Sequence, residues 1–533
     1  MNHNSSPHTL LRGASIVAPL NLLSRLLGFV RDMLVAKLLG TGFYSDIFYA
    51  AFRVPNLLRS LVGEGALTSA FVPVFAAELQ AGPAKARQAF RTALAFLLVC
   101  TITLSLCGII FAKEIVALLA PGFLSDTRKY EMCVKLTRVM LPYIIFVSFV
   151  AVLGGALNTL KIFGWPAMAQ AVMNTTLIAA AYLAFYFDNE VAVEILSWSI
   201  LVGGVTQLLV QLPALRKAGL LGWPIFRLRE SVIYRIISLM VPAAFGAGVY
   251  QITVFTNTLF QSLLEEGTVS YLYNADRLIQ LPIGIFSIAL ASVLLPTLAS
   301  AAAAKDHSGF EENLSNALRF TSFVILPTAA GIFFFSEELI SVMFERGAFD
   351  VESTRKTALV VKTLALGIWP VSCHSMVIRA FIARQDTRTP AYIAVLTLLV
   401  NLPLAICFMG PPVSNATGFF GEVVLSAQEL LKPITISWRH AGLGLASSIS
   451  ATCGLVVTVF LLKRKYAVNL KSFIEASLKA LLGTCLLIIV WDLFSDALHP
   501  SWLRLLIGAL LGTGLYLGTT LLLRSREAID CAK

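Results

Sequence analysis

Long apolar runs separated by short polar segments extend over almost the whole chain. We count fourteen runs, each long enough for a helix that crosses a membrane, which needs about 20 mostly apolar residues. The runs do not alternate strictly between apolar and polar positions, as the strands of a transmembrane barrel do, so they favour helices. The predicted helices cover residues 14–39, 46–79, 90–111, 132–157, 165–187, 192–214, 231–262, 268–302, 314–336, 357–383, 388–410, 440–462, 473–495 and 502–523.

The composition leads to the same fold class. Hydrophobic residues make up 57% of the 533 residues and charged residues 13%, with a mean hydropathy of +0.80. A soluble protein is about half apolar and about a quarter charged. We therefore predict an all-α polytopic membrane protein of about fourteen transmembrane helices. The first dozen residues lack the pattern of a secretory signal peptide, so we expect no cleaved leader.

The charges of alternate loops predict the orientation in the membrane. Basic residues gather in the loops 80–92 and 215–235 and again between residues 463 and 471, whereas the loops near 188–190 and 265–266 carry only acidic charges. Because cytoplasmic loops are enriched in Lys and Arg, both termini are expected in the cytoplasm. The net charge of +11 is spread along the chain instead of forming one dense tract, so no nucleic acid partner is expected.

An internal repeat relates the two halves of the chain. Arg53 and Arg277 lie in similar segments at an offset of 224 residues (277 − 53), and Pro166 and Pro390 repeat that offset. Further along, the offset rises to about 250, and the segment 412–438 accounts for the difference because it has no counterpart in the first half. The sequence therefore predicts two homologous six-helix bundles and an insertion.

These landmarks define the predicted domains. Residues 1–222 form an N-terminal six-helix lobe, residues 223–466 a C-terminal six-helix lobe, and residues 467–533 two further helices and a cytoplasmic tail. The insertion 412–438 is expected on the periplasmic side, where residues 422–431 would form a short amphipathic helix on the membrane surface.

Transporters built from two homologous bundles generally bind the substrate between them and move it by alternating access.

Charged residues inside the predicted spans are the candidates for a substrate site. Each costs about 2.5–3.5 kcal/mol on insertion scales, so such residues mark functional pathways by default. Guanidinium groups bind phosphate oxygens in a bidentate manner and stay charged at any accessible pH, which indicates a diphosphate ligand. The candidates are Arg25, Arg59 and Arg277 as the clamp, Arg31 and Arg53 as further cations, and the acids Asp46 and Glu64.

An alternative for each arginine stays open. A single arginine near a helix end can extend to the lipid headgroups, or a neighbouring carboxylate can neutralise it. Asp32 is the simplest such partner, because it directly follows Arg31. That alternative does not explain why the opening helices of both halves carry arginine at repeat-related positions.

No enzyme site is expected. The chain has no Walker A, GxSxG or HExxH motif, and His374 and His440 lack a second ligand at a recognised spacing. Its eight cysteines show no CxxC pair, so they predict neither a metal site nor a disulfide framework. We expect no cofactor and no metal. The pattern indicates a transporter.

Several blocks of the sequence resemble the MurJ/MviN family of lipid II flippases, with the most specific match near the N-terminus. The resemblance extends from about residue 14 to residue 523. The blocks are residues 24–32, 55–59, 64–66, 70–73, 275–278, 294–296 and 384–390, with Asp46 between the first two.

The resemblance implies a fold, a substrate and a pathway. The fold is that of the multidrug/oligosaccharidyl-lipid/polysaccharide exporters, with fourteen helices, and the substrate is lipid II, the undecaprenyl-diphosphate-linked precursor of peptidoglycan. Arg25, Arg31, Arg59 and Arg277 would line a cationic central cavity, with Asp46 and Glu64 as nearby functional acids. The last two helices would hold the undecaprenyl tail in a groove. The resemblance also implies a bacterial inner membrane as the location and roles in cell wall biogenesis and cell shape. The implied partners are the lipid bilayer and the cell-wall synthesis machinery.

Two departures and three alternatives accompany this resemblance. Gln280 stands where some members of the family have an acid. The insertion 412–438 is longer than the usual loop, and we expect this insertion to contact a periplasmic partner or to gate the outward exit.

The alternatives to a lipid II flippase are a flippase for another polyprenyl-diphosphate-linked glycan, a cation-coupled drug exporter, and a membrane scaffold without transport. A drug exporter should have about twelve helices and acids in its cavities, whereas this sequence offers arginines.

Overall fold

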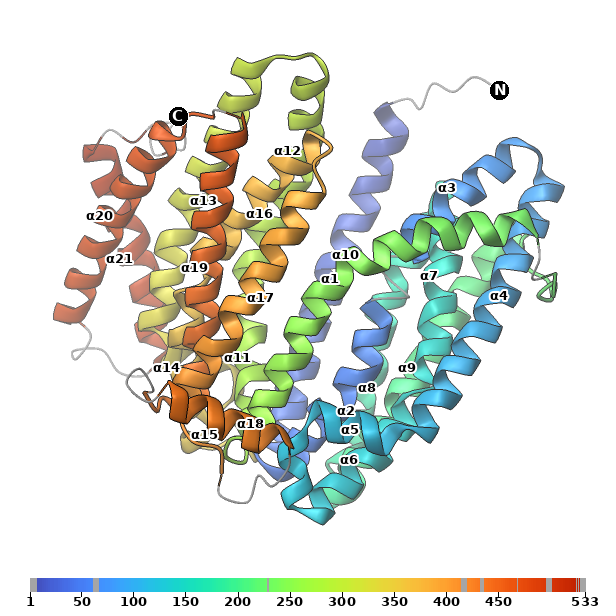
Figure 1. The fold of residues 1–533 in the computed structure, drawn as a ribbon, viewed down its shortest axis with the longest axis horizontal. Helices are drawn as coiled ribbons and strands as arrows, with labels where there is room; N and C mark the ends of the chain where they lie inside the picture. The colour runs from blue at the N-terminus through green and yellow to red at the C-terminus, as the bar shows by residue number, and fades with distance from the viewer. Residues whose placement is uncertain are drawn as a thin grey trace. The chain divides into compact units, whose positions relative to one another are not determined.

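The computed structural model describes residues 7–60, 67–227, 230–413, 419–431, 436–466, 468–494, 501–523, 525 and 527. These residues are mostly helical, and no strand occurs among them, which confirms the all-α fold class. The contacts between helices divide the described chain into two compact units, one up to Val269 and one from Ser270 onward. We call them unit 1 and unit 2 and describe each separately (Figure 1).

Unit 1 is built from ten α-helices and a short 3₁₀ turn within its described residues. They are α1 (Pro7–Leu39), α2 (Phe43–Leu58), α3 (Leu67–Gln80), α4 (Pro83–Ile110), α5 (Ala112–Leu119), η2 (Pro121–Ser125), α6 (Thr127–Met140), α7 (Tyr143–Thr159), α8 (Gly164–Ala184), α9 (Asn189–Lys217) and α10 (Ser231–Ser262). Helix α8 packs between α1 and α9, and α10 packs along α3. The core of the unit includes Phe71, Phe75 and Phe90, where α3 meets α4; the rings of Phe71 and Phe75 stack, and the Phe90 ring packs against both at a steep angle.

Unit 2 repeats much of this arrangement and adds two helices at its C-terminal end. Its helices are α11 (Thr268–Pro282), η3 (Ile283–Ser287, a π-helical turn), α12 (Ile288–Ala303), α13 (His307–Phe334), α14 (Ser336–Phe344), α15 (Val351–Ala365), α16 (Ile368–Ala383), α17 (Arg388–Met409), α18 (Phe419–Leu430), α19 (Arg439–Tyr466), α20 (Lys471–Phe494) and α21 (Ser501–Leu522). Helix α17 packs on α19, and α20 packs on α13 and on α21. Phe310, Met376 and Phe381 are buried in its core.

Equal spacing of the helices confirms the predicted repeat. Helix α13 begins and ends 224 residues after α4, and α14, α15 and α17 begin 224 residues after α5, α6 and α8. The π-helical turn follows the same rule, since one lies at residues 59–60 and the other begins at residue 283. After the insertion the offset changes, and α19 begins 250 residues after α9. The two halves therefore share one chain path up to α8 and α17.

Local backbone details repeat as well. Asp126 caps α6 by accepting from the backbone N–H groups of residues 128 and 129, and Asp350 caps α15 by accepting from the N–H of residue 353. Lys161 and Gln385 both have a positive φ, 62° and 61°, in the turns that precede α8 and α17. Non-glycine residues adopt this conformation rarely, so its recurrence at the same offset supports a common origin of the halves.

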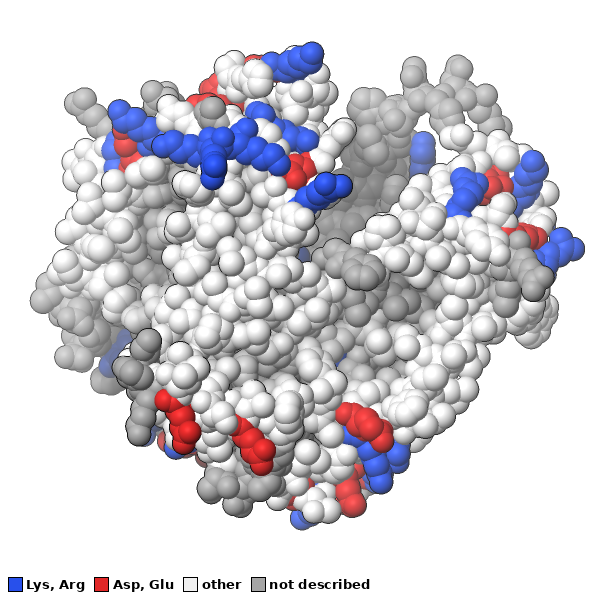
Figure 2. Space-filling model, viewed as in Figure 1, with Lys and Arg blue, Asp and Glu red and all other residues white. Residues whose placement is uncertain are grey.

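The apolar surface agrees with a membrane-spanning fold. Ten helical segments of the described chain are long and apolar enough to cross a membrane, or eleven if the bent pair α15 and α16 is one span. Three predicted spans fall on α1, on α2 with α3, and on α10, outside this set, so the total of fourteen stays a prediction. In Figure 2 each unit shows a broad uncharged surface, with Lys, Arg, Asp and Glu gathered toward its ends.

The structure adds helices where the sequence indicated none. Helices α5 and α14 are eight and nine residues long and lie in the segments 112–131 and 337–356, which we expected to be loops. Helices of this length are too short for an apolar window of membrane-spanning size to detect. A helix is confirmed near the expected range 422–431, since α18 covers Phe419–Leu430; its place on the membrane surface stays a prediction. The Gln428 amide on α18 donates to the carbonyl oxygens of Ile406 and Gly410 at 3.0 and 2.7 Å, which holds α18 against the end of α17.

Candidate functional site

Arg31 on α1 forms the most elaborate contact among the predicted arginines. Its Nη2 atom lies 2.7 Å from the Oδ1 atom of Asp32, and its Nη1 atom donates to the Oδ1 atom of Asn174 at 3.0 Å. The predicted neutralising role of Asp32 is confirmed by this ion pair. Both side chains of the pair are largely buried, so the charge of Arg31 is compensated inside unit 1.

Asn174 was not singled out by the sequence, although it holds two helices together. Its Nδ2 atom donates to the carbonyl oxygen of Ser24 at 2.9 Å, while its Oδ1 atom accepts from Arg31. A Cβ atom on Gly28 would lie 3.4 Å from the same Nδ2 atom, so this glycine permits the close approach of α1 and α8. The only signal in the sequence was an amide side chain in an otherwise apolar helix.

Arg25 and Arg59 lie in different surroundings within unit 1. Arg25 is exposed near the middle of α1, and its side chain forms no hydrogen bond or ion pair with the residues that the structure describes. Arg59 follows α2 at the π-helical turn, where its Nε and Nη2 atoms donate to the Oδ1 atom of Asn56 at 3.1 and 2.9 Å. Arg53 is half-buried on α2, and Glu64 lies outside the described residues.

Asp46 is 1% exposed at the start of α2 and joins three segments of unit 1. Its Oδ2 atom accepts from the Lys129 ammonium on α6 at 3.1 Å and from the backbone N–H of Gly267 at 2.8 Å. The ammonium also lies 4.7 Å from the ring centroid of Phe123. A buried carboxylate that accepts from an ammonium and a backbone N–H fixes the spacing of the elements that supply them. No pattern along the chain indicated that Lys129 is the partner of Asp46.

Arg277 on α11 is the candidate that belongs to unit 2. Its Nη2 atom donates to the Tyr273 hydroxyl oxygen at 2.6 Å, and its guanidinium carbon lies 4.7 Å from the centroid of the same ring. The neighbouring Asp276 carboxylate accepts from the amide of Gln280, one turn further along α11. Arg277 stands six residues before its π-helical turn, as Arg53 does before residues 59–60, so the repeat places both arginines at equivalent positions.

The described part of the chain contains no group of three or more His, Cys, Asp and Glu side chains that could hold a metal ion. His374 lies on α16, where its Nδ1 atom is 3.0 Å from the Thr458 hydroxyl of α19, and the centroid of the His440 ring is 5.3 Å from that of Tyr271. Both histidines therefore pack inside unit 2. What the site offers chemically is cationic hydrogen-bond donors.

Comparison with known proteins identifies the family. The family model described as lipid II flippase MurJ matches residues 35–507, which is most of the chain. The chain belongs to the MurJ family of lipid II flippases. The match contains five of the seven site candidates predicted from the sequence, whereas Arg25 and Arg31 precede its first residue.

Curated members of the family support the same assignment. A lipid II flippase MurJ of Burkholderia cenocepacia is 37% identical over 398 residues, covering 74% of this chain and 77% of that protein. A probable lipid II flippase MurJ of Rhizobium meliloti is 36% identical and covers 81% of each chain. A probable MurJ of Buchnera aphidicola subsp. Acyrthosiphon pisum is 31% identical, covering 89% of this chain and 94% of its own.

Solved structures share the fold. A lipid II flippase MurJ in an inward closed conformation matches with a TM-score of 0.77 at 24% identity, covering 95% of this chain and 97% of that one. An inward-facing multidrug resistance MATE family transporter of the MOP superfamily matches with a TM-score of 0.68 at 13% identity, covering 85% and 98%. The exporter fold that the resemblance implied is therefore confirmed for this chain.

Proposed function

We infer that this protein translocates lipid II, the undecaprenyl-diphosphate-linked peptidoglycan precursor, from the inner to the outer leaflet of the bacterial inner membrane. Membership of the lipid II flippase family carries this inference. The repeat of helices α1 to α8 in α10 to α17 supports transport by alternating access, because such repeats supply two lobes that can move against each other. The lobes we propose are residues 1–222 and 223–466, with 467–533 as the C-terminal addition.

We propose that Arg25, Arg59 and Arg277 bind the diphosphate of the substrate. Arg25 supports this role most directly, since an exposed arginine in the middle of an apolar helix needs water or an anion as its neighbour. Arg59 donates to the side-chain oxygen of Asn56 and Arg277 to the hydroxyl oxygen of Tyr273, and these bonds orient the two guanidinium groups.

The other candidates act around this clamp. Arg31 and Arg53 add positive charge beside the binding residues, although the Asp32 carboxylate already compensates Arg31. We propose that Asp46 contributes by holding α2 against α6 instead of touching the substrate, since its carboxylate already accepts from Lys129 and Gly267. Glu64 is proposed as a second functional acid on the sequence pattern alone.

The location and partners follow from the proposed function. We propose that both termini are cytoplasmic, which the basic loops 80–92 and 215–235 support. The ends of unit 1 near α5 and α6 are then periplasmic, together with the insertion that contains α18. Direct contact with the cell-wall synthesis machinery is also proposed, because the flipped precursor is consumed on that side.

Complementation tests this proposal. The gene is expressed in a strain whose own lipid II flippase is depleted, and lipid II in the outer leaflet is scored by its access to an externally added reagent. Rescue with restored access is the expected result. Failure with an expressed and inserted protein would contradict lipid II as the substrate and favour another polyprenyl-diphosphate-linked glycan.

Variants of the clamp test the site in the same strain. Arg25→Ala, Arg59→Ala and Arg277→Ala are each expected to abolish rescue while leaving the amount of inserted protein unchanged. Arg216→Ala, at the exposed end of α9, is the matched control and should rescue like the unmodified protein. Normal rescue by all three clamp variants would refute the diphosphate clamp.

A further inference from the structure

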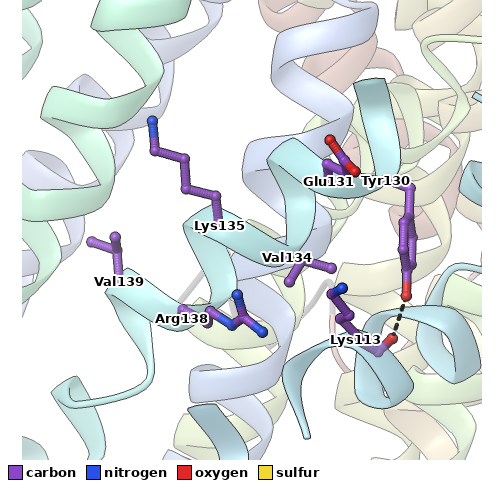
Figure 3. A pocket seen from close by; sticks show the side chains of 7 residues that line it. All are labelled: Lys113, Tyr130, Glu131, Val134, Lys135, Arg138 and Val139. Atoms are coloured by element: carbon purple, nitrogen blue, oxygen red, sulfur yellow. Dashed lines mark hydrogen bonds between the residues drawn. The ribbon is translucent and has the colours of Figure 1, made fainter. Parts of the chain in front are cut away.

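A cationic pocket lies in unit 1 between α5 and α6. It has a volume of about 430 Å³, and Figure 3 shows the side chains that line it. Its lining residues are Lys113 from α5 and Tyr130, Glu131, Val134, Lys135, Arg138 and Val139 from α6. None of them belongs to the arginine set proposed to bind the transported lipid.

The pocket is built by the helical period and by one bond between its walls. Glu131, Lys135 and Arg138 are spaced by four and three residues along α6, so they lie on one face of that helix. The Tyr130 hydroxyl donates to the carbonyl oxygen of Lys113 at 2.9 Å, which fixes α5 beside α6 (Figure 3). This bond joins the two walls of the pocket.

The charges of the pocket leave one net positive charge. Lys135 forms an ion pair with Glu194 of α9, so the lining residues and this partner together carry three cations and two carboxylates. The Nε atom of Arg138 donates to the carbonyl oxygen of Ile109 at 3.2 Å, and its other two nitrogens make no hydrogen bond within the described residues. The Lys113 ammonium forms no ion pair there either. A ligand with one negative charge matches this balance.

The surroundings of the pocket are apolar. Ile110 and Phe111, which directly follow the carbonyl that Arg138 contacts, are 68% and 55% exposed, and Leu118 on α5 is 48% exposed. Val134 and Val139 contribute apolar surface to the pocket itself. Exposed apolar side chains at the end of a membrane-spanning helix contact acyl chains, whereas basic groups between helices bind lipid headgroups.

We propose that this pocket binds the headgroup of an anionic phospholipid in the leaflet next to α5 and α6. The phosphodiester contacts the Lys113 ammonium and the two outer nitrogens of Arg138, and the acyl chains lie along Ile110 and Phe111. A phosphodiester carries one negative charge, which fits the net charge of the pocket. Free phosphate and a lipid diphosphate carry about two or more charges at neutral pH and lack that fit. By the predicted orientation, the leaflet is the periplasmic one.

The internal repeat supplies a natural comparison for this site. The positions 224 residues after Lys113 and Lys135 are Glu337 and Leu359, so two of the three cations are missing in unit 2. The position equivalent to Arg138 is Lys362 on α15, which keeps a positive charge without the other two. Lys362→Ala is therefore a matched control, because it removes one charge from the corresponding helix.

Binding of lipids to the purified, delipidated full-length protein tests the proposal. Phosphatidylglycerol and phosphatidylcholine are titrated and bound lipid is counted by native mass spectrometry, with an excess of inorganic phosphate as competitor. Phosphatidylglycerol should bind in preference to phosphatidylcholine. Each lost cation should weaken that binding about fivefold, so Arg138→Ala loses about fivefold and Lys113→Ala/Arg138→Ala about 25-fold.

Three controls make the result decisive. Lys362→Ala and Arg25→Ala should bind phosphatidylglycerol as the unmodified protein does. If Lys362→Ala weakened the binding as much as Arg138→Ala, the cause would be a general effect of charge and not a site. If Arg25→Ala weakened the binding as much, the lipid would be bound at the transport site. Displacement of the lipid by inorganic phosphate would show a site for a soluble anion. Each of these outcomes overturns the proposal, as does unchanged binding in both pocket variants. The single variant Lys113→Ala is the one expected to fold normally, because the Lys113 ammonium bonds to no other described residue. Weaker lipid binding by this variant therefore cannot be attributed to misfolding.

Discussion

The buried pair of Asp46 and Lys129 offers a quantitative test of how unit 1 is held together. At the observed 3.1 Å, two unit charges attract each other by about 5 kcal/mol at an effective dielectric constant of about 20. Lys129→Met leaves the Asp46 charge buried with the Gly267 N–H as a remaining donor, and breaking a buried pair in this way costs about 3–5 kcal/mol. The double variant Lys129→Met/Asp46→Asn buries no charge, so it should recover most of that loss.

Arg128 and Glu190 provide the matched control on the neighbouring position of α6. They form an ion pair of 2.8 Å, but their side chains are 66% and 49% exposed. Water screens such a pair, so Arg128→Met should cost at most about 1 kcal/mol.

Thermal unfolding of the purified variants in detergent measures the ranking. We expect a large decrease in the melting temperature for Lys129→Met, a smaller one for the double variant and almost none for Arg128→Met. If the double variant were as unstable as Lys129→Met, the loss would come from packing of the lysine stem and the electrostatic account would be wrong. If all variants melted together, the pair would not hold α2 and α6.

Two further predictions concern other parts of the fold. A Cβ atom on Gly122 would lie 1.8 Å from a backbone oxygen, so Gly122→Ala should lower the melting temperature strongly, whereas Gly331→Ala, with nothing within 4 Å, should not; equal melting would contradict the described path of η2. Burial disfavours the charged form of Asp386, but the bonds from Lys465 and Thr389 outweigh it and lower its pKa to about 2. Because the folded pKa lies below the unfolded value of about 3.9, this stabilisation is present above pH 4 and is lost only as the pH falls through 2. Asp386→Asn should therefore cost about 1.5–3 kcal/mol equally at pH 5 and pH 8, and a pH-dependent difference in melting temperature would contradict this assignment.

The sequence was most informative about features that depend on local periodicity and hydrophobicity. The helix expected at 231–262 matches α10, and the one expected at 388–410 matches α17 to within one residue. The repeat was visible in Arg53 and Arg277, and the structure confirms it in the bounds of α4 and α13. These features follow from the length of an apolar run and from residue identity, and both can be read directly from the sequence.

Short helices were beyond this kind of inference. Helices α5 and α14 have too few residues for a membrane window, and their formation depends on packing against α6 and α15. They nevertheless shape the molecule, since α5 supplies one wall of the cationic pocket with Lys113. The pocket could not be found from the sequence, because its two walls are separated by the η2 turn.

For the candidate site, the sequence by itself determined which charges lie in apolar helices, and it paired Arg31 with Asp32 because adjacent residues need no fold to meet. Only the tertiary structure decided that Arg31 also donates to the side-chain oxygen of Asn174 and that Lys129 neutralises Asp46. Those partners are 143 and 83 residues away along the chain. A pattern along the sequence predicts which residues lie on one face of a helix. Which residues of another helix contact that face is set by how the two helices pack.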